Sequence, residues 1–263
     1  MIPLLHNALN RGIVPSLSVT VRRFSSLIRT GYLHTSERVC PEFRDEIFEN
    51  HLKVYKFLVQ LVENKDILEV GCGTGYGTFL LAERAISVSA IDYSSQAIRY
   101  AYRNYHAENI SYSVMKAEKL QFASDSFDVA LSSEVFEHLR DQRGHLREVS
   151  RVLRPNGLCF IATPNPEISQ GQNKFHTKEN SLPEMACLLS EFFADVQIIE
   201  TLLDPPTEQK QKDKQSRIAL GYRGLDPRSE LDLFGIRIDK TFLHNTHSFF
   251  CFAKGKRPKN SCG

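Results

Sequence analysis

The sequence has no tryptophan, only three methionines and no large excess of either charge in its 263 residues. No apolar run approaches the roughly 20 residues that a membrane-spanning helix needs, so no transmembrane segment is expected. The formal net charge of +2 argues against a nucleic-acid partner, because such modules usually concentrate basic residues on one face. Hydrophobic residues (41%) and charged residues (24%) are balanced as in a globular protein with a real core.

Paired cysteine motifs are also missing. None of the six cysteines forms a C-x-x-C pair, so neither a zinc ribbon nor a redox dithiol is indicated. Dispersed cysteines in a chain of this length favour a reducing compartment, and we expect a cytoplasmic protein. The six are Cys40, Cys72, Cys159, Cys187, Cys251 and Cys262.

Acidic residues are absent from residues 1–36, which contain four arginines and several serines before Glu37. This composition is typical of a mitochondrial presequence, which would make the protein mitochondrial. The other interpretation is an N-terminal extension that is disordered or loosely docked. We favour the extension and keep the mitochondrial location as the alternative.

From about residue 41 the spacing of apolar residues becomes regular. Helical spacing alternates with short apolar runs, and this order predicts an α/β fold with a mostly parallel sheet and helices on both faces. The predicted helices are 43–62, 77–84, 94–104, 141–153 and 179–191. The predicted strands are 66–70, 87–91, 111–115, 127–132, 157–162, 194–200 and 246–253.

These elements predict one main domain over residues 37–255. A stretch dense in Lys, Gln and Asp at about 204–231 reads as a polar insertion within it. Residues 256–263 form a short basic tail, which is too short to indicate a nucleic-acid interface.

A glycine-rich loop follows the first predicted strand. Gly71, Gly73 and Gly75 permit a sharp turn and a close approach of the backbone to a ligand. Their G-x-G-x-G spacing differs from the G-x-G-x-x-G that holds a pyrophosphate. Glu69 would repel a pyrophosphate but can attract the ammonium group of an amino-acid moiety through a water molecule. Asp92 ends the next strand, where a carboxylate can accept hydrogen bonds from both hydroxyls of a ribose.

The chain resembles class I S-adenosylmethionine-dependent methyltransferases, in the type 11 branch that includes quinone-biosynthesis enzymes. The resemblance covers about residues 37–200, and it depends on six motifs. They are LEVGCGTG (68–75), ID (91–92), SFDV (126–129), EHL (137–139), RVLRPNG (151–157) and TPN (163–165). A weaker similarity, in residues 173–179, is to bacterial methyltransferases of polysaccharide clusters.

The resemblance implies a Rossmann-like seven-stranded sheet in which one strand, here 246–253, is antiparallel. It also implies binding of S-adenosylmethionine, with the loop backbone at the methionine part, Asp92 at the ribose, and residues 117–118 beside the adenine. The implied cofactor-binding residues are Glu69, Gly71, Cys72, Gly73, Gly75, Asp92, Tyr93, Ala117, Glu118 and Ser133. Lys116 departs from the family pattern, because an acid commonly contacts the adenine amino group there and lysine has no acceptor.

Candidate catalytic residues follow the fourth predicted strand. On one helical turn, Glu134, Glu137 and His138 would share a face. His138 could be the general base for an acceptor hydroxyl, since histidine titrates near neutral pH. Alternatively, the three residues could hold a divalent metal with His176 as a fourth ligand, as in metal-using O-methyltransferases with a similar E-x-x-E-H pattern. A purely structural role is the third interpretation.

The predicted activity is methyl transfer to a small-molecule or saccharide acceptor, with O-methylation favoured. The alternative is a non-catalytic, methyltransferase-like partner protein, which only Lys116 favours. A nucleotide-dependent oxidoreductase would need the other glycine spacing and a catalytic Tyr/Lys pair, which we do not find. No feature of the sequence predicts an oligomeric state.

Overall fold

A computed structural model describes residues 39, 41, 46–169, 173–200, 231–233, 236–238 and 248–257. The predicted extension at 1–36, the insertion up to residue 230 and the tail beyond residue 257 lie outside this part of the chain. The longer helices are α3 (Glu46–Leu58), α4 (Tyr76–Ala82), α5 (Ser95–Asn104), α6 (Gln142–Val152) and α8 (Leu182–Phe192). Two short ones are η2 (Phe136–His138), a 3-10 helix, and α7 (Pro166–Ser169).

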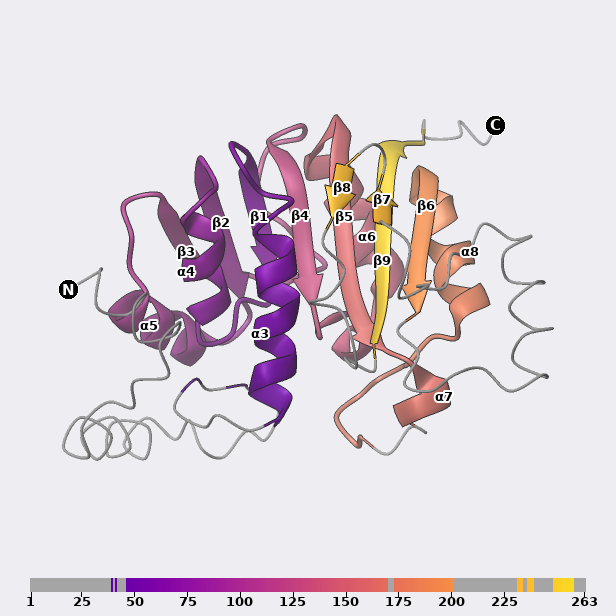
Figure 1. The fold of residues 1–263 in the computed structure, drawn as a ribbon, viewed down its shortest axis with the longest axis horizontal. Coiled ribbons are helices and arrows are strands. Elements are labelled where there is room, and N and C mark those ends of the chain that lie inside the picture. Colours follow the sequence, from indigo (N-terminus) through magenta and orange to yellow (C-terminus); the bar gives the residue numbers. More distant parts are fainter. Residues whose placement is uncertain are drawn as a thin grey trace.

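Seven strands form the central sheet, in the order β3-β2-β1-β4-β5-β9-β6 (Figure 1). They are β1 (Asp66–Val70), β2 (Ser87–Asp92), β3 (Ile110–Val114), β4 (Phe127–Ser133), β5 (Leu153–Pro164), β6 (Phe193–Glu200) and β9 (Ser248–Lys256). The pairs from β3 to β5 are parallel, whereas β9 is antiparallel to both β5 and β6. The predicted seven-stranded, mostly parallel sheet is therefore confirmed, including its antiparallel strand.

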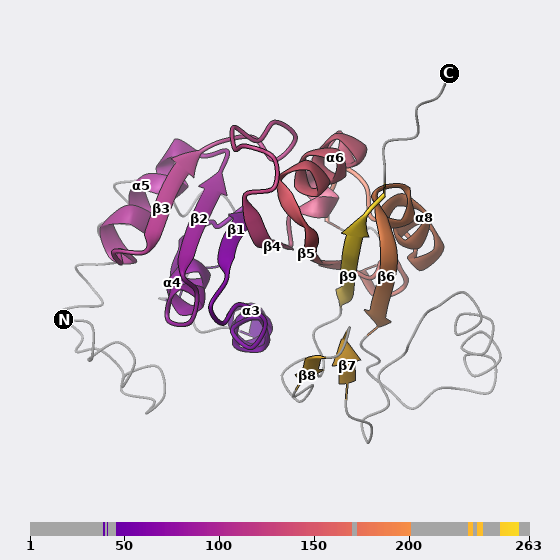
Figure 2. The same cartoon turned by 90° about the horizontal axis from the view of Figure 1, so that it is seen from above.

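Helices cover both faces of this sheet. Figure 2 shows α3 and α4 on one side and α6 and α8 on the other. One apolar cluster joins the first face to α3, α4 and Tyr100 of α5, and the second joins the other face to α6 and α8. Because both faces are buried, central strands such as β1 and β5 contain nearly continuous apolar runs, as parallel strands usually do.

Side chains that cap the helices explain where several of them begin. The Ser94 hydroxyl accepts from the Ala97 N–H at 3.3 Å, and an Asp141 carboxylate oxygen accepts from the Gly144 N–H at 2.7 Å. Ser181 and Glu184 form a reciprocal capping box at α8. The predicted start of that helix at residue 179 was therefore too early.

Other boundaries also differ from the prediction. Helix α3 ends at Leu58, before the predicted residue 62, because 3-10-type bonds from the Gln60 and Leu61 N–H groups tighten its end. Strand β5 starts at Leu153, which pairs with Phe127 across a register shift in the ladder. Two strands were not predicted at all, β7 (Leu231–Leu233) and β8 (Ile236–Ile238), which form a separate antiparallel pair. Among the described residues, no helix is long and apolar enough to cross a membrane.

Candidate cofactor and acceptor site

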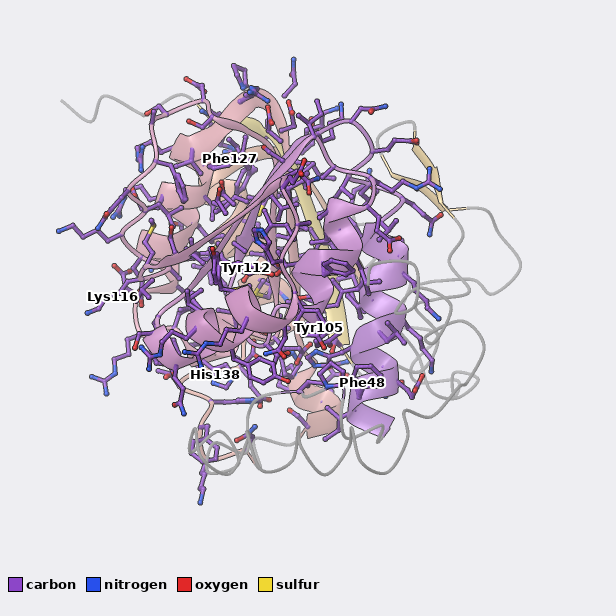
Figure 3. All side chains as sticks on the ribbon, turned by 90° about the vertical axis from the view of Figure 1, so that its left-hand side faces the viewer. Phe48, Tyr105, Tyr112, Lys116, Phe127 and His138 are labelled. Atoms are coloured by element: carbon purple, nitrogen blue, oxygen red, sulfur yellow. The ribbon has the colours of Figure 1, made fainter. Side chains whose placement is uncertain are left out.

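A cavity of about 810 Å³ opens where β1, β2 and β4 end. The last residues of these strands, Val70, Asp92 and Ser133, all line it. Figure 3 shows His138 toward this end of the molecule and Phe127, the first residue of β4, toward the opposite end. Ligands of open α/β sheets bind at the carboxyl ends of the strands, so the cavity lies where this fold places its ligands.

The glycine loop forms the floor of this cavity between β1 and α4. Gly71 and Gly73 have positive φ angles of 76° and 54°, a region that other residues rarely adopt. The N–H groups of Gly71 and Cys72 both donate to the Ile91 carbonyl, at 2.8 and 2.9 Å, and tie the loop to β2. A Cβ atom at Gly71 would lie 2.3 Å from a methyl group of Val135, so this position requires glycine for space as well as for conformation.

Asp92 faces the loop from the end of β2. Its side chain is 6% exposed, and its two oxygens accept from the Gly73 N–H at 3.1 Å and the Ser94 N–H at 2.8 Å. Ser94 caps α5, so Asp92 is not needed as the helix cap. Its carboxylate therefore orients the loop while it lines the cavity.

Glu69 and Gly75 are the two predicted cofactor residues that do not line the cavity. The Glu69 carboxylate accepts from the Tyr55 hydroxyl at 2.7 Å and from the Thr78 hydroxyl at 2.5 Å. Burial raises its pKa above the ordinary value, against these two hydrogen bonds. Tyr55 from α3 lines the cavity in front of Glu69, so direct contact between Glu69 and an ammonium group is not supported.

The turn after β3 forms another wall. The Lys119 N–H donates to the Lys116 carbonyl at 3.1 Å, which closes a turn with Ala117 and Glu118 at its tip. Lys116, Ala117 and Glu118 all line the cavity, as does Met115. Lys116 is exposed, and Glu118 is the carboxylate of this turn.

The predicted helical turn through Glu134, Glu137 and His138 is wrong. Glu134 has a φ of 53°, and helical structure covers only Phe136–His138. Glu134 instead accepts a hydrogen bond from the Ser248 hydroxyl of β9 at 2.9 Å, with its N–H bonded to the Ala162 carbonyl. All three predicted residues still line the cavity, because the turn after β4 brings them there.

Glu137 is buried, with 1% of its side chain exposed. One carboxylate oxygen accepts from the Thr163 hydroxyl at 2.9 Å, and the other makes no hydrogen bond within the described chain but lies 3.7 Å from His138 Nε2. Burial, and then the nearby charge of Glu134, raise the pKa of Glu137 well above its ordinary value. Burial thus favours the neutral form of Glu137, and its distance from His138 Nε2 is longer than a hydrogen bond.

Two histidines complete this wall. His138 Nδ1 lies 3.1 Å from the Phe175 carbonyl, and His176 Nδ1 lies 2.5 Å from a Glu179 oxygen. Since both partners are acceptors when Glu179 is ionised, the Nδ1 atoms are the donors and the Nε2 atoms carry the lone pairs. The rings are 4.9 Å apart. Ligand atoms of Glu137, His138 and His176 all lie within 4.8 Å of one another, whereas Glu134 is outside this group.

Three residues that support this wall were not identified as such from the sequence. Thr163 and Ser248 hold the two glutamates, and Glu179 holds His176. Ser248 is 114 positions from Glu134, so no local pattern could have indicated the contact. His176 and Glu179 are three positions apart, and this short spacing was the only signal in the sequence for their contact.

The chain is similar to known methyltransferases in sequence and in fold. Residues 68–161 match the family described as "Methyltransferase domain". A probable S-adenosylmethionine-dependent methyltransferase of Mycobacterium tuberculosis is 38% identical over 172 residues, which cover 62% of this chain and 61% of that protein. A ubiquinone biosynthesis O-methyltransferase of Parvibaculum lavamentivorans is 37% identical over 111 residues, which cover 41% of this chain and 43% of that protein.

Among solved structures, the N-methyltransferase NodS of Bradyrhizobium japonicum, in complex with S-adenosyl-L-homocysteine, has the same fold. Its TM-score is 0.55 at 16% identity, and the match covers 89% of this chain and 98% of that one. The matched part of the chain spans about three fifths of the length of its first curated relatives. These matches confirm the resemblance to S-adenosylmethionine-dependent methyltransferases.

Proposed function

We propose that this chain is an S-adenosylmethionine-dependent methyltransferase that methylates a hydroxyl group of a small-molecule or saccharide acceptor. The observation that carries the proposal is that one cavity joins two kinds of wall. The glycine loop and Asp92 form the cofactor side, and Glu137, His138 and His176 form the acceptor side. The methyltransferase relatives support the cofactor, and the ubiquinone O-methyltransferases among them support oxygen as the acceptor atom.

On the cofactor side, the chain's own groups bind and orient. The backbone of Gly71 to Gly73 offers a close approach for the methionine part, since no Cβ atom stands in the way at the two glycines. Asp92 accepts from the ribose hydroxyls, and Ser133 and Glu134 lie where the sulfonium would be. The sulfonium supplies an activated methyl group, so the protein's tasks are to position it and to exclude water.

On the acceptor side, His138 removes the proton of the acceptor hydroxyl. Its Nδ1–H bond to the Phe175 carbonyl fixes the ring and leaves Nε2 as the basic atom. Glu137 lies 3.7 Å from that nitrogen, and the charge of an imidazolium there would favour the ionised carboxylate, which would in turn stabilise the imidazolium. Burial raises the pKa values of both Glu134 and Glu137, so each is neutral more readily than an exposed carboxyl.

A divalent metal on the same residues is a second candidate, and it has its own support. The buried Glu137 oxygen makes no hydrogen bond within the described chain, and each imidazole donates through Nδ1, as metal-bound histidines do. His176 Nε2 lies 2.9 Å from the Asn173 amide nitrogen, so a bound ion would have to replace that contact. One carboxylate and two imidazoles suit manganese, iron or zinc better than magnesium. Such an ion would act as a Lewis acid that lowers the pKa of the acceptor hydroxyl. Glu179 would then orient His176 through Nδ1.

The cofactor is tested first by calorimetric titration with S-adenosylmethionine and with NADH. We expect binding of S-adenosylmethionine alone, and its loss in Asp92→Ala, whose thermal unfolding serves as the check on folding. If the wild type does not bind S-adenosylmethionine, the proposal fails and a non-catalytic partner protein becomes the better reading.

The two acceptor-side mechanisms separate in an acceptor screen that detects S-adenosylhomocysteine. His138→Ala should lower kcat about 100-fold or more with cofactor affinity unchanged, as expected for loss of a general base. Turnover that survives chelation supports the base. Turnover lost on chelation, restored by manganese and weakened in His176→Ala but not in Glu134→Gln, supports the metal.

The compartment and the domain limits are part of the proposal. The dispersed cysteines, none of which is in a C-x-x-C pair, support a cytoplasmic protein. Fluorescent fusions with and without residues 1–36 test this, since a mitochondrial signal that requires those residues would favour the presequence. Limited proteolysis tests the 37–255 domain and its insertion at 204–231, where we expect the first cuts.

A further inference from the structure

Three polar side chains on α6 point at the turn that follows β3. His145, Glu148 and Arg151 are three residues apart, so they share one face of the helix. That face contacts the backbone between Ala117 and Phe122, and the first residues of this segment line the cavity.

Each of the three holds the backbone by at least one hydrogen bond. His145 Nδ1 lies 3.1 Å from the Ala117 carbonyl, and a Glu148 oxygen accepts from the Leu120 N–H at 2.9 Å. Arg151 donates to the Leu120 carbonyl at 2.9 Å and to the carbonyl of residue 122 at 2.7 Å. Side chains of α6 therefore supply hydrogen bonds to the backbone of this segment that a neighbouring strand would supply in a sheet.

The row formed by His145, Glu148 and Arg151 is itself held in place. Arg151 forms a fork on Glu148, with Nε and one terminal nitrogen each 2.9 Å from a carboxylate oxygen. Bidentate pairs of this kind have a defined geometry. The Arg151 hydrogen bond is also the main cause that lowers the pKa of Glu148, so the acid stays ionised as an acceptor.

His145 is the member closest to the cavity, and it is fully buried. Its Nε2 makes no hydrogen bond within the described chain, and burial lowers its pKa. A neutral imidazole bonded to a carbonyl must donate, so the proton is on Nδ1 and the Ala117 carbonyl is fixed. The next residue, Glu118, carries the only carboxylate of the turn from Lys116 to Lys119.

We propose that His145 is a positioning residue that sets the selectivity of this site for adenine. It fixes the Ala117 carbonyl, and through it the direction of Glu118, whose carboxylate accepts from the 6-amino group of the base. Glu148 and Arg151 hold the other end of the same segment. This inference rests on the proposed cofactor.

The test compares S-adenosylhomocysteine with S-inosylhomocysteine, which carries an oxygen in place of the 6-amino group. We expect the wild type to prefer the adenine ligand by about tenfold or more, since a lost bond to a charged group is worth at least that much. In His145→Leu the ratio of the two dissociation constants should fall to within about threefold of one. His145→Gln, whose amide can still donate to the carbonyl, should keep most of the preference.

A matched control separates positioning from general loss of stability. Val149 is buried on the same helix, so Val149→Ala should lower the melting temperature while it keeps the wild-type ratio. Should His145→Leu fail to fold, Glu148→Gln tests the same row and should also lower the ratio. A wild-type ratio in the variants of the row would overturn the inference while the cofactor assignment stands. A wild type that binds neither ligand would remove the proposed function itself, and the inference with it.

Discussion

Replacing Tyr55 by phenylalanine removes one hydroxyl group from a buried network and leaves the ring in place. That hydroxyl donates to Glu69 at 2.7 Å, and the carboxylate keeps only its bond from Thr78. Both Tyr55 and Glu69 are buried, with 7% and 2% of their surfaces exposed, so water cannot replace the lost donor without a rearrangement. We therefore expect a large effect for the loss of a single oxygen atom.

The expected loss in the free energy of unfolding is about 1–3 kcal/mol, the usual penalty for a buried polar group that loses its partner. For a domain of this size, each 1 kcal/mol lowers the melting temperature by about 2–4 °C, so the melting temperature should fall by roughly 2–12 °C. Tyr102→Phe is the matched control, because its ring is 60% exposed and water can solvate the site. The control should melt within about 1 °C of the wild type.

The loss should also depend on pH, with a sign that follows from Glu69. Burial raises its folded-state pKa above the ordinary 4.5, so its contribution to stability is fully present below that pH and is lost as pH rises through the folded pKa. The Tyr55 bond lowers this pKa, and without it the charged form becomes costlier. The destabilisation by Tyr55→Phe should therefore be larger at about pH 8 than at about pH 5.

Urea unfolding of both variants at the two pH values measures these differences. An unchanged midpoint for Tyr55→Phe would show that the hydroxyl does not stabilise the folded state. A loss of the same size at both pH values would show that the carboxylate charge is not its partner. Either result would refute the account of why Glu69 lies behind the cavity and not in its wall.

Three further predictions concern the loop, the ribose site and the thiols. Gly71→Ala should cost about 2–5 kcal/mol through its positive φ and a methyl contact at 2.3 Å, and should abolish calorimetric binding of S-adenosylmethionine. Gly255→Ala, with a similar φ of 73° but no contact under 3.4 Å, should cost only about 1–2 kcal/mol and leave binding intact. Asp92→Asn should weaken binding about 10- to 100-fold and also lower the melting temperature, because the amide nitrogen cannot accept from the Gly73 or Ser94 N–H, whereas an unchanged affinity would remove Asp92 from the site. Cys187 is exposed, so Cys187→Ser should remove one rapidly reacting thiol from the native protein, while Cys159, with its pKa raised to about 12 by burial, should react only after unfolding.

The sequence by itself determined the sheet, the glycine loop after β1 and the position of Asp92 at the end of β2. Buried strands can be predicted from local apolar runs, and the loop between β1 and α4 from its glycines, because glycine adopts positive φ angles more readily than other residues. Asp92 followed from the same logic, since the end of a parallel strand is next to the end of its neighbour. Helix ends were less accurate, because caps such as that of Ser181 compete with the apolar periodicity.

Only the tertiary structure decided which acidic residues face the cavity. Glu69 was expected there, but Tyr55 of α3 lines the cavity instead and donates a hydrogen bond to the Glu69 carboxylate. Glu134 was expected to join Glu137 on a helical turn, but its positive φ turns it toward Ser248 of β9. Partners this far apart in the chain meet only when the sheet is assembled, and the direction of a buried carboxylate depends on which donors it meets there.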